Sequence, residues 1–341
     1  MNTVLTFLRD HRERLALEQR GVPQQLTAVL LTPRFQASRH VIAMILPVGS
    51  VEPVLVAKVP RLASDGTALA HEAEILRALQ ADGDGEGSIP QVIAFEEVSG
   101  FPLLIETALT GTLLDRAAVR RDPAGSCELG LAWLLRMALP SRGTLDGAAW
   151  ERLIGGPLGA FAASFPLAAE EEALLAETRA WAESLRGDDL PLVLEHGDLS
   201  HPNLIVGRSG RLGVVDWELA RLQGLPGHDL FFFLTYVAFA RQRADEIAAQ
   251  VNAFRAAYFG DGAWAAPYLA RYAGHLWLSA EQMRALFVLC WARYTWSLWE
   301  RVTRAEAVTG DDGERAAWLR ANRYYRLWGE ALRHVQRLSL P

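Results

Sequence analysis

Residues 195–203 read EHGDLSHPN, and residues 214–218 read VVDWE. These two short stretches concentrate polar side chains that can take part in chemistry. Asp198 follows Gly197 and the end of a predicted strand, so its carboxylate can project from a loop. A carboxylate in that position can orient an attacking hydroxyl group and accept its proton. The first stretch therefore predicts a general base.

Asn203 and Asp216 fall at the two ends of a predicted hairpin. Strand patterns cover residues 203–206 and 211–215, with GRSG at 207–210 as the turn. Pairing of these strands brings an amide oxygen and a carboxylate oxygen close together. Such ligands suit Mg²⁺, which also keeps phosphate oxygens and water in its coordination shell.

Lys58 is the only lysine among the 34 basic residues of the chain. It lies in VLVAKV at residues 54–59, a pattern typical of a buried strand. A lone charge is costly there unless an opposite charge pairs with it, and Glu72 and Glu74 of the next predicted helix are the candidates. Since arginine serves every other basic position, position 58 is expected to need a compact ammonium group. Chance placement of a single lysine is the alternative interpretation.

The front third of the chain mixes strand and helix patterns. An amphipathic helix is predicted within residues 1–20, and a Gly- and Asp-rich loop at residues 81–88. Between and after them the predicted order is β-β-β-α-β-β, with strands at 26–31, 40–46, 54–59, 91–95 and 102–105 and a helix at 67–80.

After Gly111 the pattern changes to helix, which places a boundary near residues 106–112. Short strands at 192–194, 203–206 and 211–215 interrupt the helical part. The predicted helices cover residues 112–119, 126–139, 146–154, 168–186, 228–241, 244–258, 279–302 and 314–336.

Composition excludes several classes of protein. Half of the 341 residues are hydrophobic and 22% are charged, which supports a folded core. The net charge of −6 provides no general basic field for nucleic acid or an anionic membrane. Two cysteines are too few for a disulfide framework and fit a reducing cytosol. With no signal-peptide pattern and no apolar run of about 20 residues, a cytoplasmic protein without nucleic-acid or membrane partners is expected.

The combination of HGD at 196–198, Asn203 after four intervening residues, and DWE at 216–218 resembles the aminoglycoside phosphotransferase family. That family includes antibiotic, choline, homoserine and sugar kinases. Other segments of this chain follow the same order as in that family, and the resemblance covers about residues 25–235. They are VAK at 56–58, HEAEIL at 71–76, IPQVIA at 89–94, LIETALTG at 104–111 and GHDL at 227–230.

This resemblance implies an α+β, protein-kinase-like bilobal fold with a small β-rich N-lobe and a large, mostly helical C-lobe. The expected divisions are an N-terminal helix at 1–20, a nucleotide-binding N-lobe at 21–106, a hinge at 107–111 and a C-lobe at 112–341. It further implies transfer of the γ-phosphate of ATP or GTP, with Mg²⁺, to a hydroxyl group of a small molecule.

The same resemblance assigns roles to individual residues. Asp198 would be the catalytic aspartate, and Asn203 and Asp216 would hold Mg²⁺. Lys58 would contact the nucleotide phosphates, and the register favours Glu72 over Glu74 as its brace. Backbone groups of Glu106 and Ala108 would meet the purine, and Asp229 would tie the catalytic loop in place.

One segment departs from the family pattern. The phosphate-binding loop of kinases usually carries glycines, but TPRFQASR at residues 32–39 has none. Backbone N–H groups could still hold phosphate, with contacts added by Ser38 or Arg39, although glycine is what normally permits close approach. A nucleotide-binding scaffold without turnover is therefore the alternative function. A metal hydrolase built on His196, Asp198 and His201 is a third, disfavoured by ligand spacing and by the absence of a nearby cysteine.

The identity of the acceptor is less constrained. From Arg241 onward the chain carries 14 arginines and 10 acidic residues, whereas a polycationic aminoglycoside would favour an acidic cleft. We therefore expect a neutral or weakly charged acceptor, such as a sugar, cyclitol, related natural product or metabolite. Six tryptophans from 277 to 328 are interpreted as core packing, or as one or two stacking surfaces for an acceptor. The expected assembly is a monomer or homodimer.

Overall fold

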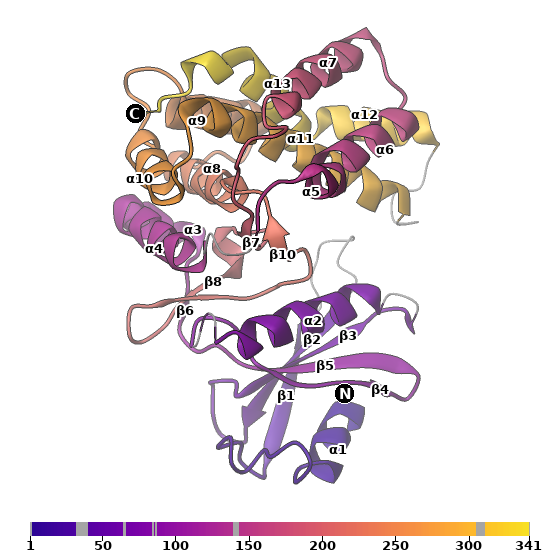
Figure 1. Ribbon diagram of the computed structural model, residues 1–341. Coiled ribbons are helices and arrows are strands. Elements are labelled where there is room, and N and C mark those ends of the chain that lie inside the picture. The colour runs from indigo at the N-terminus through magenta and orange to yellow at the C-terminus, as the bar shows by residue number, and fades with distance from the viewer. Residues whose placement is uncertain are drawn as a thin grey trace. The chain divides into compact units, whose positions relative to one another are not determined.

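The computed structural model describes residues 2–31, 40–63, 66–83, 85, 87–138, 143–304 and 311–340. Internal contacts divide the chain into two compact units (Figure 1). The first consists of Met1–Leu113 and Asn203–Ala220, and the second of Leu114–Pro202 and Arg221–Pro341. The sequence analysis placed everything after residue 112 in a single lobe. The contacts instead assign 203–220 to the first unit.

A five-stranded antiparallel sheet, in the order β1-β2-β3-β5-β4, forms the centre of the first unit. Its central strand β3 pairs with β5 so that Lys58 lies opposite Leu104 and Val56 opposite Glu106. All five strands lie where the sequence predicts them. They are β1 (Leu26–Leu31), β2 (His40–Pro47), β3 (Leu55–Pro60), β4 (Val92–Val98) and β5 (Phe101–Thr107).

Helices α1 (Asn2–Asp10) and α2 (Thr67–Ala81) pack against opposite faces of this sheet. Successive side chains of a strand point to opposite faces, and β5 shows this directly. Leu103 and Ile105 join the core beneath α1, whereas Leu104 joins Leu69 and Ala73 of α2. Lys58, Leu104 and Glu106 therefore share the α2 face.

The segment 203–220 adds a small second sheet to the first unit. Strands β8 (Leu204–Val206) and β9 (Leu212–Val214) form the predicted hairpin, and the N–H of Gly210 donates to the carbonyl of Gly207 at its turn. Strand β6 (Thr112–Leu113) pairs with β8 where a helix from residue 112 was predicted. That prediction was wrong because Gly111, at φ +156°, lets the chain turn against the Val206 carbonyl, where a Cβ would lie 2.3 Å from its oxygen.

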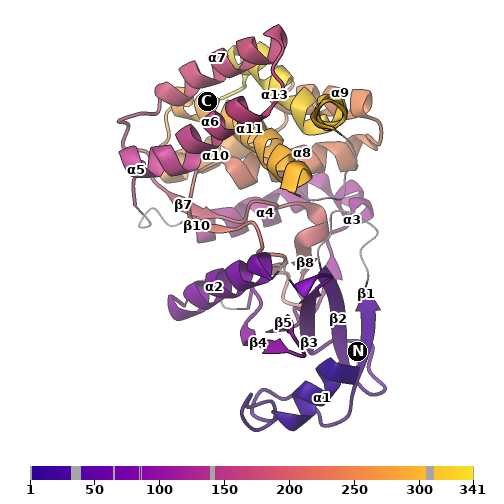
Figure 2. The ribbon, with the colours of Figure 1, turned by 90° about the vertical axis from the view of Figure 1, so that its right-hand side faces the viewer.

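Helices build most of the second unit. The longest, α11, contacts α6, α7, α8 and α13 (Figure 2). Two short strands, β7 (Val193–Glu195) and β10 (Arg221–Gly224), pair beside them. The helices are α3 (Arg116–Arg121), α4 (Pro123–Met137), α5 (Gly147–Trp150), the π-helix η3 (Glu151–Gly155), α6 (Gly156–Ser164), α7 (Ala169–Glu183), α8 (His228–Gln242), α9 (Ile247–Tyr258), α10 (Ala266–Leu276), α11 (Ala280–Arg304), α12 (Asp312–Ala321) and α13 (Arg323–His334).

Several helix predictions need correction. Helix α1 ends at Asp10, because residues 11–21 form turns in which Ala16 takes a left-handed backbone conformation that an α-helix cannot contain. The single helix predicted over 314–336 is two helices, since Asn322 caps the N-terminus of α13 with its side chain. Helices α6 and α10 were not predicted.

The tryptophans divide into two groups. Trp291, Trp296, Trp299 and Trp328 are buried, as the packing interpretation expects, whereas Trp277 and Trp318 are exposed. Within the described ranges, no helix combines the length and apolar character needed to cross a membrane.

Candidate active site

Lys58 has two carboxylate partners on the α2 face of the first sheet. Its Nζ atom lies 2.6 Å from Oε1 of Glu72 on α2 and 3.3 Å from Oε1 of Glu106 on β5. All three side chains are buried. A buried ammonium group is stable only with such partners, so the fold holds the sole lysine in one position.

Burial and neighbouring charges act in opposite directions on the protonation of this cluster. Burial alone would lower the pKa of Lys58, but the carboxylates of Glu106, Glu72 and Asp216 outweigh burial and raise that pKa. Burial raises the pKa of Glu106 to about 7, against the opposing charge of Lys58. Three acidic groups thus surround one cation. Lys58 stays charged, and an added cation would be stabilised.

Glu72 connects the lysine to the segment that carries Asp216. Its Oε1 atom accepts from both Lys58 Nζ and the backbone N–H of Trp217, at 2.6 and 2.9 Å. Glu74 is exposed on the same helix. The helix register therefore separates the two candidates as the sequence analysis expected.

Asp216 has a backbone conformation that is uncommon outside glycine, with φ at +72°. Such conformations persist when neighbouring groups fix them, and they cluster at functional sites. Here Trp217 is fully buried and donates from Nε1 to the carbonyl of Val214, and the N–H of Val215 donates to the carbonyl of Asn203. The hairpin therefore brings the backbones of Asn203 and Asp216 together.

In the second unit, three hydrogen bonds hold the backbone just before Asp198. The Asp229 carboxylate accepts from the N–H groups of His196 and Gly197 at 2.6 and 2.9 Å. The hydroxyl of Tyr294 donates to the carbonyl of Gly197 at 2.8 Å. Asp229 thus has the structural role that the resemblance implies. Asp198 directly follows a backbone segment that these hydrogen bonds hold in place.

A buried ion pair reinforces this support. Arg293 of α11 donates through both terminal nitrogens to the two carboxylate oxygens of Glu195, each at 2.9 Å. The same carboxylate accepts from the N–H of Leu225. Removing one partner of a buried pair typically costs about 3–5 kcal/mol, so this pair fixes the end of β7. The sequence analysis did not identify it, although Arg293 is the only charged residue within residues 285–299 of α11 and was a visible signal.

Phenol groups surround Asp198 within the second unit. Burial, and to a smaller extent the charge of Asp198, raises the pKa values of Tyr236, Tyr294 and Tyr324. The hydroxyl groups of Tyr236 and Tyr324 are hydrogen-bonded to each other at 2.9 Å. Asp198 therefore lies near aromatic side chains of the second unit.

His196 and His201, the two histidines of residues 195–203, are packed against neighbouring groups. His196 is fully buried, and its Nδ1 accepts from the N–H of Asp198. His201 lies with its ring 5.6 Å from that of Tyr236, and burial lowers its pKa to about 4. Among the described residues, no group of three or more His, Cys, Asp or Glu side chains could hold a metal ion. The hydrolase interpretation therefore has no ligand set there.

One of the backbone groups expected to contact the purine is hydrogen-bonded within the first unit. The N–H of Ala108 donates to the carbonyl of Val54, so it is already engaged. Glu106 contributes its side chain to the Lys58 cluster, a role that sequence reasoning missed. Strand pairing could have revealed it, because Glu106 lies two residues from Leu104, the partner of Lys58. Ser38 lies outside the described residues.

Replacing Glu106 by glutamine should change how stability depends on pH. The folded-state pKa of about 7 exceeds the ordinary 4.5. The protonated group therefore stabilises the fold at low pH, and that contribution is lost as pH rises from 4.5 through 7. Relative to Glu106→Gln, the wild type should therefore lose stability as the pH rises from 5 to 7. Urea unfolding at pH 5 and pH 7 measures the difference, with exposed Glu97→Gln as control. Parallel pH profiles for wild type and Glu106→Gln would contradict the assignment.

Comparison with solved structures identifies the fold as protein-kinase-like. The choline kinase LicA from Streptococcus pneumoniae has 16% identical residues and a TM-score of 0.55, over 95% of this chain and 99% of the other. The aminoglycoside phosphotransferase APH(4)-Ia, in a ternary complex with AMP-PNP and hygromycin B, has 16% identity and a TM-score of 0.54, over 95% and 98%. A choline/ethanolamine kinase family protein from Mesorhizobium loti has 14% identity and a TM-score of 0.50, over 91% and 92%.

The family follows from the sequence itself. The model of the APH phosphotransferase enzyme family matches residues 48–270, well over half of the chain. The chain therefore belongs to this family and is a phosphotransferase that acts on a hydroxyl group. No curated protein matches the chain in sequence.

Proposed function

We propose that this protein transfers the γ-phosphoryl group of ATP or GTP to a hydroxyl group of a small molecule, such as an antibiotic, sugar, cyclitol or related natural product. One observation carries the proposal. The Glu72 carboxylate is shared by Lys58 and by the backbone beside Asp216, so a single group fixes both the phosphate-binding cation and the metal-binding carboxylate. Kinase-type catalysis depends mainly on such positioning.

The donor set fits Mg²⁺. Asn203 offers an amide oxygen and Asp216 a carboxylate oxygen, from adjacent ends of one hairpin. Two protein ligands are enough for Mg²⁺, since it retains water and phosphate oxygens. Oε2 atoms of Glu72 and Glu106 are buried and have no hydrogen-bond partner in the described part of the chain. This excess of negative oxygen favours a cation. When bound, Mg²⁺ would neutralise charge on the phosphate oxygens.

Asp198 acts on the acceptor. Its carboxylate orients the acceptor hydroxyl and takes its proton as the oxygen–phosphorus bond forms. The bond from the γ-phosphorus to the β,γ-bridging oxygen breaks, and ADP or GDP leaves with that electron pair. Lys58 holds the nucleotide phosphates during transfer.

The protein is expected to work as a monomer or homodimer in the cytoplasm. The two cysteines, Cys127 and Cys290, are both buried and unbridged, which suits a reducing compartment.

Release of ADP or GDP from a panel of acceptors tests the proposal. With Mg²⁺ and a suitable hydroxyl compound, diphosphate release should rise above the slow acceptor-independent rate, and a phosphorylated acceptor should appear by mass spectrometry. Chelation of the metal should abolish both signals. Transfer that continues at full rate in excess chelator would refute the metal assignment.

A nucleotide-binding scaffold without turnover is the second candidate. The absence of glycine from residues 32–39 favours it, because glycine is what normally permits close approach of the backbone to the phosphates. Thermal unfolding with ATP separates the two functions. A scaffold predicts stabilisation independent of Mg²⁺ and no product across the panel, whereas the enzyme predicts stabilisation that increases with Mg²⁺.

A further inference from the structure

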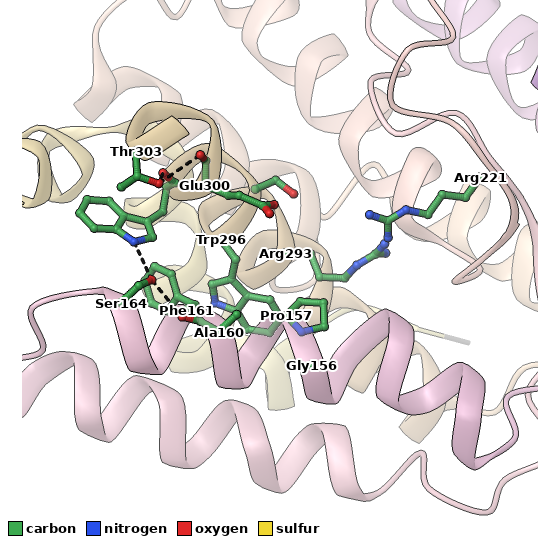
Figure 3. A pocket seen from close by; sticks show the side chains of 12 residues that line it. Gly156, Pro157, Ala160, Phe161, Ser164, Arg221, Arg293, Trp296, Glu300 and Thr303 are labelled. Carbon is green, nitrogen blue, oxygen red and sulfur yellow. Dashed lines mark hydrogen bonds between the residues drawn. The ribbon is translucent and has the colours of Figure 1, made fainter. Parts of the chain in front are cut away.

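A cavity of about 440 Å³ lies between α6 and α11 in the second unit (Figure 3). This volume is within the range of small-molecule sites. Each helix contributes residues with the same i, i+3, i+4, i+7 spacing, which places them on one face. They are Pro157, Ala160, Phe161 and Ser164 on α6, and Arg293, Trp296, Ser297 and Glu300 on α11.

Aromatic groups form much of the cavity wall. The rings of Phe161 and Trp296 lie with their centroids 6.3 Å apart. Trp299 donates from Nε1 to Oγ of Ser164 at 3.0 Å, and that hydroxyl donates to the carbonyl of Ala160. Because these polar atoms bond to each other, the small surface that this part of the wall exposes is mainly ring surface, with Phe161, Trp296 and Trp299 each 2–4% exposed.

Arginine marks another part of the cavity. Figure 3 shows Arg221 and Arg293 in its lining, and the charge of Arg293 acts on Arg221. Arg293 is neutralised by its bidentate pair with Glu195. Arg221 is exposed, and no carboxylate of the described residues forms an ion pair with it.

Charges of both signs act on Arg221. Arg293 and Arg152 add positive charge there, and Glu195 and Glu300 add negative charge. A guanidinium group in such surroundings can bind a carboxylate or phosphate through two parallel hydrogen bonds.

The cavity wall is continuous with the support of the catalytic loop. Arg293 binds Glu195, and the next residue, Tyr294, binds the carbonyl of Gly197. Glu195 precedes Asp198 by three residues, a span of at most about 11 Å. A molecule of modest length can therefore reach from the cavity to the base.

We propose that this cavity binds the phosphoryl acceptor, and that the acceptor is an alcohol with an aromatic body and an anionic group selected by Arg221. This proposal rests on the proposed function. It distinguishes this chain from an enzyme for polycationic aminoglycosides, whose amines Arg221 would repel.

Three benzyl alcohols that differ only in charge provide the test. They are 4-(hydroxymethyl)benzoate, 4-(hydroxymethyl)benzamide and 4-(hydroxymethyl)benzylamine, which are anionic, neutral and cationic near pH 7. Diphosphate release gives their relative kcat/KM values, and displacement of the fluorescent aromatic anion 8-anilinonaphthalene-1-sulfonate gives their binding without turnover. We expect the anion to exceed the amide by about 10- to 100-fold, as a charge-assisted hydrogen bond allows, and the cation to be weakest.

Two pairs of variants locate the effect. Arg221→Gln should remove the preference for the anion, whereas Arg179→Gln, an exposed arginine on α7, should retain it. Ala160→Leu should fill the cavity and weaken all three ligands, whereas Ala163→Leu, exposed on the same helix but outside the lining, should not.

The readouts separate the two proposals. Equal binding of anion and cation, or an unchanged preference for the anion in Arg221→Gln, overturns the acceptor proposal. In that case, Mg²⁺-dependent stabilisation by nucleotide and slow nucleotide hydrolysis would still support the phosphotransferase. Loss of those nucleotide signals, with anion-selective binding preserved, overturns the proposed function and with it the assignment of the bound anion as a phosphoryl acceptor.

Discussion

Replacing Asp198 by asparagine lowers kcat for phosphoryl transfer by about 10²- to 10⁴-fold, the range that general-base catalysis contributes. Asparagine keeps the size of the side chain and removes its capacity to take a proton. Steady-state kinetics with the best acceptor measures the effect. Nucleotide affinity should stay within a few-fold of wild type, because Lys58, Asn203 and Asp216, the residues proposed to bind the nucleotide and Mg²⁺, are untouched.

The fold of this variant should survive. The backbone before residue 198 is held by Asp229 and Tyr294 rather than by the Asp198 side chain. Asp189→Asn, an exposed aspartate upstream in the same segment, is the matched control and should retain full activity. Turnover of Asp198→Asn equal to that of this control, with identical thermal unfolding, would remove Asp198 from the role of base.

The first unit could be predicted well from sequence because its signals are local. Alternating strands such as Leu55–Pro60 and Phe101–Thr107 have the period that defines a strand. The helix of Glu72 follows from its apolar spacing. That 203–220 belongs to this unit was not predictable in the same way. It depends on long-range bonds, from Trp217 to Glu72 and from His71 to the carbonyl of Ala220.

The groups that escaped prediction act through tertiary contacts. Glu106 was expected to offer backbone atoms to the purine, and the additional contact of its side chain with Lys58, which strand register sets, was not predicted. Arg293 lies 98 residues from Glu195, and no sequence spacing links them. Two predicted helices are interrupted, one by the left-handed backbone conformation of Ala16 and the other by the N-terminal cap at Asn322. The spacing of apolar residues does not reveal such local features. The chemistry of a residue can thus be inferred from its type, whereas its partner requires the fold.

Replacing Lys58 by arginine should lower kcat/KM for the nucleotide by about 10²- to 10³-fold, the usual cost of losing one group that stabilises transferring charge. Charge is preserved, so the loss must come from geometry. The compact ammonium group touches Glu72 at 2.6 Å in a buried space, and a planar guanidinium group is larger and directs its hydrogen bonds differently. Phosphoryl-transfer kinetics at varied ATP concentration measures the loss, and thermal unfolding shows whether the fold is retained.

A second pair of variants tests whether the position of the ammonium group matters. Glu72→Gln keeps a hydrogen-bond acceptor for Lys58 and for the N–H of Trp217 but removes the charge, so it should weaken nucleotide use by less than Lys58→Arg. Glu74→Gln, exposed two residues further along the same helix, should behave as wild type. If Lys58→Arg were fully active, a guanidinium group at position 58 would serve the phosphates as well as an ammonium group does. The only lysine in the chain would then owe its place to something other than the reaction.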